Sequence, residues 1–325
     1  MTLRYEIVKR LADGHLVSGS VLGAEFNVSR AAVCKGIKRL RQFGLDIHSV
    51  SGRGYRLSRP LYILDRDIIV AALAQDIPDF GDRLRLLPEV DSTNRYLLKH
   101  INSADKKGAV CLAEVQVQGR GRHGRQWQTT PYRNVIFSMA WHFEAGMGQV
   151  AGLSLAAGAA IGQMLVNQGF QGIGLKWPND LVWQDRKLGG MLIDVHGEVN
   201  GPCWVVLGLG LNIDIGGVAA HKIDRPWAML SEMKDQRIDR NALVASLIGA
   251  LWKMFGVFER EGLGHFQRVW ERFHAYSGKP VVVYTQNGKL EGIAIGIDGA
   301  GALLLRDKRG QVHQMLSGEV SLSPL

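Results

Sequence analysis

The stretch QGRGRHGRQW, residues 118–127, is the feature that most constrains the fold of this chain of 325 residues. Its glycines have the G-x-G-x-x-G spacing of a dinucleotide-binding turn, and a strand-like run, AVCLAEVQV, precedes them as such a turn requires. However, only RQWQTTPYRN separates the last glycine from the next apolar run, VIFSMAWHF, and it contains Pro131 and no helical periodicity. Because so short a linker cannot form the crossover helix that joins parallel strands, we predict two antiparallel strands connected by a long loop.

This loop carries Arg120, Arg122 and Arg125, with His123 among them. The planar fork of arginine matches phosphate or carboxylate oxygens, so the loop is predicted to fold over an anionic ligand and neutralise it. The alternative is an exposed loop that binds nothing. His123 is interpreted as an ordinary exposed loop residue.

Basic charge is concentrated at the N-terminus. Residues 1–60 hold 11 Lys and Arg against 4 Asp and Glu, whereas the other 265 residues hold 28 against 26. This asymmetry predicts a nucleic-acid-binding module attached to a nearly neutral body.

Within that module, two short helical patterns are separated by Asn27 and Val28, and the second has Val33, Ile37 and Leu40 on one face. DIHSV, SGRG and YRLS then predict a β-hairpin, so the whole is typical of a winged helix. The alternative is a small helical domain with a solvated basic face. The candidate DNA-contacting residues are Ser29, which also caps the second helix, Arg30, Lys35, Lys38, Arg39 and Arg53.

Composition adds few constraints elsewhere. The chain is 46% hydrophobic, which is an ordinary globular composition, and its 325 residues are enough for two or three domains with a sizeable core. Its three cysteines are far apart and predict neither disulfides nor a thiolate metal site. We predict no signal peptide, no membrane span and a cytoplasmic location.

The remaining sequence mixes helical and strand patterns without a regular βαβ repeat, which predicts an α+β body. A helix is expected from about Gln149 to Gln168, and another after the cap Asp239. From Gly278 onward, about five short strands with glycine turns predict a small β-barrel.

Five motifs then coincide in order and spacing with bacterial biotin protein ligases: DSTN (91–94), GRGRHGRQW (119–127), KWPNDL (176–181), DRKLGGML (185–192) and GLGLNI (208–213). The chain resembles this family nearly end to end, and its winged-helix start resembles the class that doubles as biotin-operon repressor. The resemblance implies a winged helix-turn-helix over 1–60, a mixed α/β ligase domain over 61–274 and an SH3-like barrel over 275–325. Ser323 stands where well-known members carry an arginine.

The resemblance also implies a reaction. Biotin and Mg-ATP would form biotinyl-5′-AMP, which a lysine of the biotin carboxyl carrier protein of acetyl-CoA carboxylase then attacks. The adenylate would also act as corepressor, favouring a homodimer that binds operator DNA. No covalent enzyme intermediate is needed, so positioning and charge stabilisation would supply most of the acceleration.

Site residues are carried over from matching positions. The biotin site would comprise Ser92, Thr93, Asn94, Gln116, Arg120, Gly121, Arg122 and Lys187, and the nucleotide site Arg122, Trp127, Asn179 and Asn212. Arg122, Lys187 and Asp180 would be catalytic, with Asp180 either binding Mg²⁺ or orienting the incoming lysine amine. Two alternatives remain open at this point: a lipoate or octanoate ligase or transferase of related fold, and a ligand-sensing transcription factor without turnover.

Overall fold

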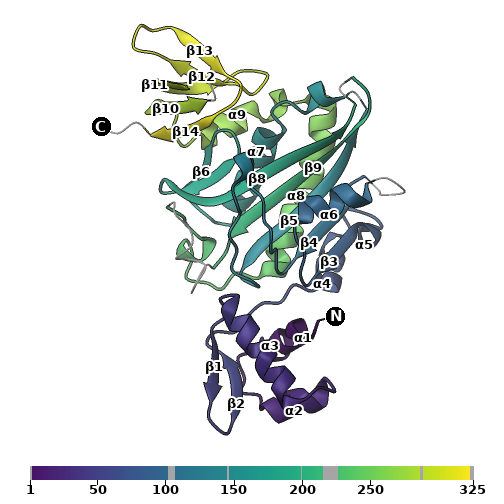
Figure 1. Cartoon of the computed structure of the whole chain (residues 1–325). Helices are drawn as coiled ribbons and strands as arrows, with labels where there is room; N and C mark the ends of the chain where they lie inside the picture. Colours follow the sequence, from purple (N-terminus) through teal and green to yellow (C-terminus); the bar gives the residue numbers. More distant parts are fainter. Residues whose placement is uncertain are drawn as a thin grey trace.

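The computed structural model describes residues 2–101, 107–144, 146–198, 200–214, 226–285 and 288–322. Three units follow one another along the chain: a small helical unit with a hairpin, a large sheet with helices, and a C-terminal sheet (Figure 1). The small unit and the C-terminal sheet lie at opposite ends of the central body (Figure 1). Ser323 lies outside the described residues.

The N-terminal unit consists of α1 (Leu3–Leu11), α2 (Gly19–Glu25), α3 (Arg30–Gln42) and the antiparallel hairpin of β1 (Ile47–Val50) and β2 (Gly54–Leu57). The predicted helix-turn-helix and wing are confirmed. The Ser29 hydroxyl caps α3 by accepting from the backbone N–H of Ala32 at 3.2 Å, as expected. Helix α1 is an addition to the prediction, because its charged residues dilute the apolar pattern of Ile7, Val8 and Leu11, which are all buried.

The central sheet has the order β3-β4-β5-β9-β8-β7-β6. Only β3 and β4 are parallel, and β4 pairs antiparallel with β5 across the arginine-bearing loop, as predicted. Strand β4 is shorter than the apolar run that predicts it, since the chain leaves the sheet after Ala113. The strands are β3 (Leu84–Leu87), β4 (Val110–Ala113), β5 (Asn134–Phe143), β6 (Ile173–Lys176), β7 (Asp180–Trp183), β8 (Arg186–Gly197) and β9 (Cys203–Asn212).

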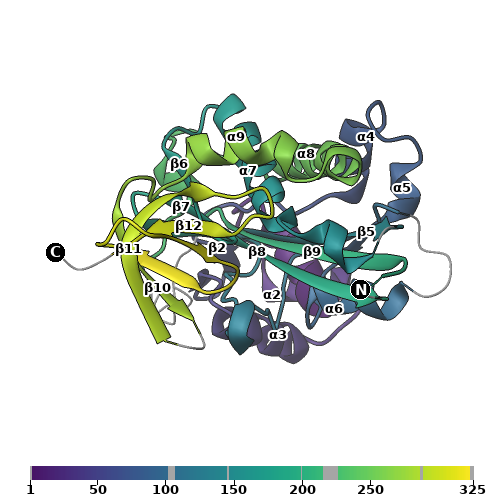
Figure 2. The ribbon, with the colours of Figure 1, turned by 90° about the horizontal axis from the view of Figure 1, so that it is seen from above.

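Helices cover the two faces of this sheet unequally. Figure 2 shows α7 (Leu153–Asn167), α8 (Arg240–Glu261) and α9 (Gly264–Phe273) on one side and α6 (Thr93–His100) on the other. The short α4 (Arg66–Leu73) packs on α8, followed by α5 (Phe80–Arg83). Helix α7 begins four residues later than predicted, because its N-cap residue Gly152 has a left-handed φ of +75° and separates the helix from the preceding 3₁₀ turn.

Two segments, Met147–Asn167 and Arg240–Glu261, are long and apolar enough to cross a membrane by composition alone. More than half of the hydrophobic window in α8, and half of that in the α7 segment, is buried inside the protein. Both helices supply side chains to the main core, including Leu165 and Phe255. Their apolar character is therefore accounted for by packing against the sheet and against each other.

The C-terminal sheet has the five strands that were predicted, in the order β13-β12-β11-β10-β14. They are β10 (Pro280–Thr285), β11 (Gly288–Ile297), β12 (Leu303–Arg306), β13 (Val312–Met315) and β14 (Glu319–Leu322). Its inward residues Val281, Val283 and Leu303 belong to the same hydrophobic cluster as the central helices. The unit is thus held against the central body by a shared core.

The segment that joins the N-terminal unit to the sheet is fixed by a buried ion pair. Arg240 Nη2 donates to Glu114 Oε2 at 2.8 Å, and the two side chains are 4% and 0% exposed. Both also hold the linker: the backbone N–H of Leu64 donates to Glu114 Oε1 at 2.6 Å, and Arg240 Nη1 donates to the carbonyl of Tyr62 at 2.7 Å. The linker is therefore a structured part of the central core.

The N-terminal unit also packs directly on the body. Val115 and Tyr132 of the central unit are 5% and 4% exposed and belong to the hydrophobic cluster of the winged helix. Tyr5 of α1 packs against that cluster, and Arg4 pairs with Glu89 at 2.9 Å. The contact surface thus combines apolar packing with an ion pair at its rim.

A pH-sensitive group lies between α9 and the C-terminal sheet. His274 is 9% exposed, its ring centroid is 4.6 Å from that of Trp270, and its Nδ1 has no partner among the described residues. Burial lowers the pKa of His274 to about 4.

This burial predicts a loss of stability in mild acid. Because the folded pKa lies below the unfolded value of about 6.5, the unfolded state binds the proton first and the fold is fully stable only above pH 6.5. Between pH 7.5 and pH 5 the wild type should lose about 2 kcal/mol of unfolding free energy through this group. His274→Phe, which keeps an aromatic ring on Trp270, should lose less over the same interval in urea titrations. Equal losses in the two proteins would contradict the assignment.

Candidate active site

A cavity of about 800 Å³ opens on the α6 side of the central sheet. Its walls come from the start of α6, the arginine loop (residues 118–127), the β7–β8 hairpin, the end of β9 and strand β14 of the C-terminal unit. All twelve residues that the sequence analysis assigned to biotin, nucleotide or catalysis line this cavity: Ser92, Thr93, Asn94, Gln116, Arg120, Gly121, Arg122, Trp127, Asn179, Asp180, Lys187 and Asn212.

One end of the cavity is a network of neutral hydrogen-bonding groups. Gln116 Oε1 accepts from the backbone N–H of Thr93 at 2.9 Å and from its hydroxyl at 3.2 Å. Ser138 Oγ lies 2.7 Å from Thr93 Oγ1 and donates to Asn94 Oδ1 at 2.5 Å. Ser138 is fully buried and was absent from the predicted site, although one serine within the apolar run VIFSMAWHF is a signal that could have found it.

Two glycines of β9 make room for this wall. A Cβ atom at Gly208 would lie 2.1 Å from Asn94 Oδ1, and one at Gly210 would lie 2.4 Å from the Trp127 ring. The GLGLNI motif therefore lets two site side chains rest directly on the strand backbone. Trp127 Nε1 is buried and has no hydrogen-bond partner among the described residues. Because an unpaired buried N–H is costly, this position favours a ligand that brings an acceptor.

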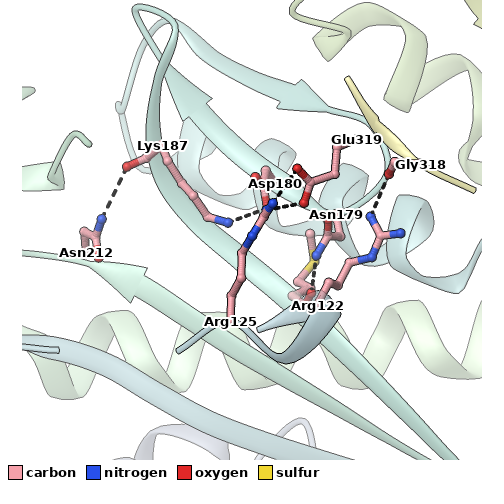
Figure 3. Close-up of polar contacts among 9 residues, drawn as sticks. Arg122, Arg125, Asn179, Asp180, Lys187, Asn212, Gly318 and Glu319 are labelled. Atoms are coloured by element: carbon pink, nitrogen blue, oxygen red, sulfur yellow. Dashed lines mark hydrogen bonds and ion pairs between the residues drawn. The ribbon is translucent and has the colours of Figure 1, made fainter. Parts of the chain in front are cut away.

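The other end of the cavity is charged. Lys187 Nζ donates to Asp180 Oδ1 at 2.7 Å (Figure 3). The same Nζ lies 5.5 Å from the centre of the Trp127 ring. Asn212 Nδ2 donates to the Lys187 carbonyl at 3.3 Å, and Asn179 Nδ2 donates to that of Met191 at 2.6 Å (Figure 3). These two amides hold the strand backbones around the ion pair, so Lys187 is aimed into the cavity from a fixed support.

The arginine loop reaches from the sheet to the C-terminal unit. Arg122 Nη1 donates to the carbonyl of Gly318 at 3.1 Å, and Arg125 forms an ion pair with Glu319 (Figure 3). Burial lowers the pKa of Arg122, whereas the charges of Asp180 and Glu319 raise it. The guanidinium stays protonated at neutral pH, because arginine cannot be deprotonated in proteins. Glu319 was missed in the sequence, since nothing local indicates which residue of a distant strand meets the loop.

Comparison with known proteins agrees with this arrangement. The profile of the HTH domain matches residues 4–56, that of the Biotin/lipoate A/B protein ligase family residues 86–212, and that of the Biotin protein ligase C terminal domain residues 276–323. The bifunctional ligase/repressor BirA of Escherichia coli K12 is 37% identical over 321 residues, which cover 99% of this chain and 97% of that protein. The chain belongs to the BirA family of bifunctional ligase/repressors.

More distant relatives support the same family. BirA of Bacillus subtilis is 25% identical over 333 residues, which cover 99% of both chains. The solved biotin protein ligase from Aquifex aeolicus, in complex with biotin and ATP, has a TM-score of 0.63 and 25% identity, and the match covers 74% of this chain and 98% of that one. This BirA-family protein is accordingly a biotin ligase of the class that carries its own DNA-binding domain.

The candidate DNA-contacting residues of this BirA-family protein lie on a separate surface of the N-terminal unit. Arg41, also on α3, joins this helix to the wing, because its guanidinium donates to the Ile47 carbonyl at 2.7 Å and to Ser49 Oγ at 2.8 Å. The proposed residues Ser29, Arg30, Lys35, Lys38, Arg39 and Arg53 are all exposed on α3 and the wing.

Proposed function

We propose that this protein joins biotin to ATP, releasing pyrophosphate, and then transfers biotin from the adenylate to a lysine of the biotin carboxyl carrier protein of acetyl-CoA carboxylase. The observation that carries this proposal is the polarity of the cavity. A neutral hydrogen-bonding network at one end suits the ureido ring, and Lys187 and Arg122 at the other suit a carboxylate and phosphates.

In the first step, an oxygen of the biotin carboxylate attacks the α-phosphorus of ATP, and the bond from that phosphorus to the bridging oxygen breaks. Negative charge grows on the phosphoryl oxygens and on the departing pyrophosphate. Lys187 and Arg122 are the cations placed to stabilise it. Trp127, whose Nε1 lacks a partner among the described residues, would wall the adenine, and Asn179 and Asn212 would support the nucleotide end.

Mg²⁺ would enter with ATP and neutralise phosphate charge. The donor set fits this use, since Asp180 and Asp185 both line the cavity. The described residues contain no group of three metal-ligating side chains. Phosphate oxygens and water would therefore complete the coordination shell of the ion. We assign Asp180 as the protein carboxylate for the ion. Its contact with Lys187 Nζ gives it a further role, holding the ammonium in place before ATP binds.

In the second step, the carrier lysine amine attacks the acyl carbon of the mixed anhydride. An amide bond forms, the bond to the phosphate oxygen breaks, AMP leaves and the amine releases its proton. The assay is direct: the protein is mixed with biotin, Mg-ATP and a carrier domain, and the carrier mass is measured. We expect one biotinyl group, and none on a carrier whose acceptor lysine is arginine. An unmodified carrier, or equal use of lipoate or octanoate, would contradict the assignment as a biotin ligase.

We further propose that the adenylate-bound protein forms a homodimer that represses transcription from a palindromic operator, in the cytoplasm where its substrates and DNA are found. Burial of the adenylate under the arginine loop would stabilise the ordered state of that loop and so shift the monomer–dimer equilibrium. Gel shifts with operator DNA should strengthen when biotin and ATP are both present. Absence of binding under every ligand condition would refute the repressor function.

The exposed lysines of α3 give a quantitative prediction for DNA binding. If Lys35 and Lys38 each neutralise one phosphate, the double variant Lys35→Ala/Lys38→Ala should bind DNA more weakly. The slope of log K against log salt concentration should also become less negative by about 2. Fluorescence anisotropy measured between about 50 and 200 mM salt gives this slope. Lys253→Ala, on the distant helix α8, is the control. An unchanged slope would remove these two residues from the interface.

A further inference from the structure

Asp194 lies beside the neutral end of the cavity without lining it. It is on β8, in register with Val206 of β9, and its side chain is 21% exposed. One carboxylate oxygen accepts from Asn94 Nδ2 at 2.9 Å, and the other lies 3.3 Å from Arg120 Nη2. Both of these partners line the cavity, one from the start of α6 and the other from the arginine loop. Asp194 therefore joins two segments of the site that are distant in sequence.

The contact with Asn94 fixes the direction of its amide. An ionised carboxylate can only accept, so the Asn94 nitrogen must face Asp194, where it also donates to the Leu192 carbonyl at 3.3 Å. The amide oxygen is then turned toward Ser138, whose hydroxyl donates to it at 2.5 Å. Asp194 thereby sets the orientation of the last member of the network that Gln116 begins.

The contact with Arg120 reaches the loop itself. Arg120 forms an antiparallel bridge with Gln126, and the backbone N–H of Trp127 donates to the carbonyl of Gly119 at 3.0 Å. Because Arg120 and Gln126 are bridged, a contact that holds the Arg120 guanidinium at β8 also restrains the returning segment of the loop at Gln126, directly before Trp127. The pair is only partly exposed, at 41% for Arg120 and 21% for Asp194, so solvent screens it incompletely.

We propose that Asp194 is a positioning residue that couples occupancy of the ring end of the cavity to closure of the arginine loop. A ring bound against Thr93 and Asn94 steadies Asn94, which steadies the Asp194 carboxylate and the Arg120 guanidinium that it binds. By linkage, a closed loop strengthens ring binding by the same factor. This inference rests on the proposed function for the identity of the ring, which is biotin.

The test compares Asp194→Asn, Arg120→Gln and the double variant in steady-state carrier biotinylation. Asp194→Asn keeps the shape and removes the charge, so we expect KM for biotin to rise roughly five- to thirtyfold, as for loss of a charge-assisted hydrogen bond. KM for ATP should change less than KM for biotin, because Asp194 contacts Asn94 of the ring end directly and reaches Trp127 only through the loop. The double variant should match the more affected single variant, since both remove one interaction.

Trypsin cleavage after Arg122 and Arg125 supplies a second reading. In the wild type, biotin should slow cleavage of the loop; in Asp194→Asn this protection should be lost at biotin concentrations that still saturate the site. Asp194→Glu, which keeps the charge, should recover part of it. Glu198→Gln is the matched control, because Glu198 is an exposed carboxylate just beyond the same strand.

The outcomes separate the two claims. A wild type that binds no biotin and modifies no carrier contradicts the proposed function. An active wild type with unchanged biotin KM and unchanged loop protection in Asp194→Asn overturns this inference alone, as does a double variant whose effect is the product of the single ones. If Asp194→Asn fails to fold by circular dichroism, Arg120→Gln, whose altered side chain is 41% exposed, takes its place, and unchanged protection of the loop by biotin in that variant overturns the inference.

Discussion

Lys187→Met should lower the rate of adenylate formation by about 10²–10³-fold while leaving the fold intact, on the scale observed when one group that stabilises transition-state charge is removed. The ammonium is aimed into the cavity by the Asn212 contact to its own backbone and by Asp180. Methionine keeps most of the length of the side chain but not its charge. Pyrophosphate release at saturating biotin and ATP measures the effect.

Two additional proteins sharpen this test. Lys187→Met leaves the Asp180 carboxylate, whose side chain is 17% exposed, without its cation. Lys187→Arg, which keeps a cation beside that carboxylate, should retain more of the rate than Lys187→Met if charge stabilisation is the cause. Lys253→Met, on the surface of α8, should have the wild-type rate. Adenylate formation at the wild-type rate in Lys187→Met would show that the lysine acts elsewhere.

Arg240→Met should produce the largest loss of stability of the single substitutions considered, about 3–5 kcal/mol of unfolding free energy. It removes the guanidinium that pairs with Glu114 and leaves that carboxylate fully buried without its cation. Arg240 also donates to the carbonyls of Tyr62 and Asn134, so the linker and the start of β5 lose their support together. Urea unfolding followed by tryptophan fluorescence measures the loss.

The matched double variant Glu114→Gln/Arg240→Met should recover part of the stability, because it removes the unpaired charge that accounts for much of the penalty. An exposed pair provides the contrast: Lys253→Met, which breaks the contact with Asp76, should change stability by less than about 1 kcal/mol. A loss for Arg240→Met as small as that of Lys253→Met would mean that the buried pair contributes no more than a surface pair.

Local features of the chain were predictable because their causes are local. Ser29 and Asp239 cap their helices as expected, and the short, proline-bearing linker after Gly124 correctly excluded a parallel pair of strands. The prediction that twelve residues contribute to one site had no such local basis. That prediction followed from resemblance to a family, since no periodicity or spacing indicates that Ser92 and Asn212 line the same cavity.

The parts that escaped prediction depend on strand register and on packing between units. Ser138 and Asp194 each have apolar neighbours on both sides in their strands, and only the order β5-β9-β8 places both beside Asn94. Glu319 meets Arg125 across 194 positions of sequence. Such pairs are fixed by how whole sheets pack, which single-residue patterns do not record.

The seat of the winged helix on the central unit has a consequence for ligases of other lengths. Val115 and Tyr132 are apolar because the N-terminal unit covers them, and both flank segments of the ligand site: Val115 directly precedes Gln116, and Tyr132 follows the arginine loop. A related enzyme that dispensed with DNA binding would expose this surface to water, where selection favours polar side chains. The residue types at these two positions should therefore differ between ligases that carry a winged helix and ligases that lack one.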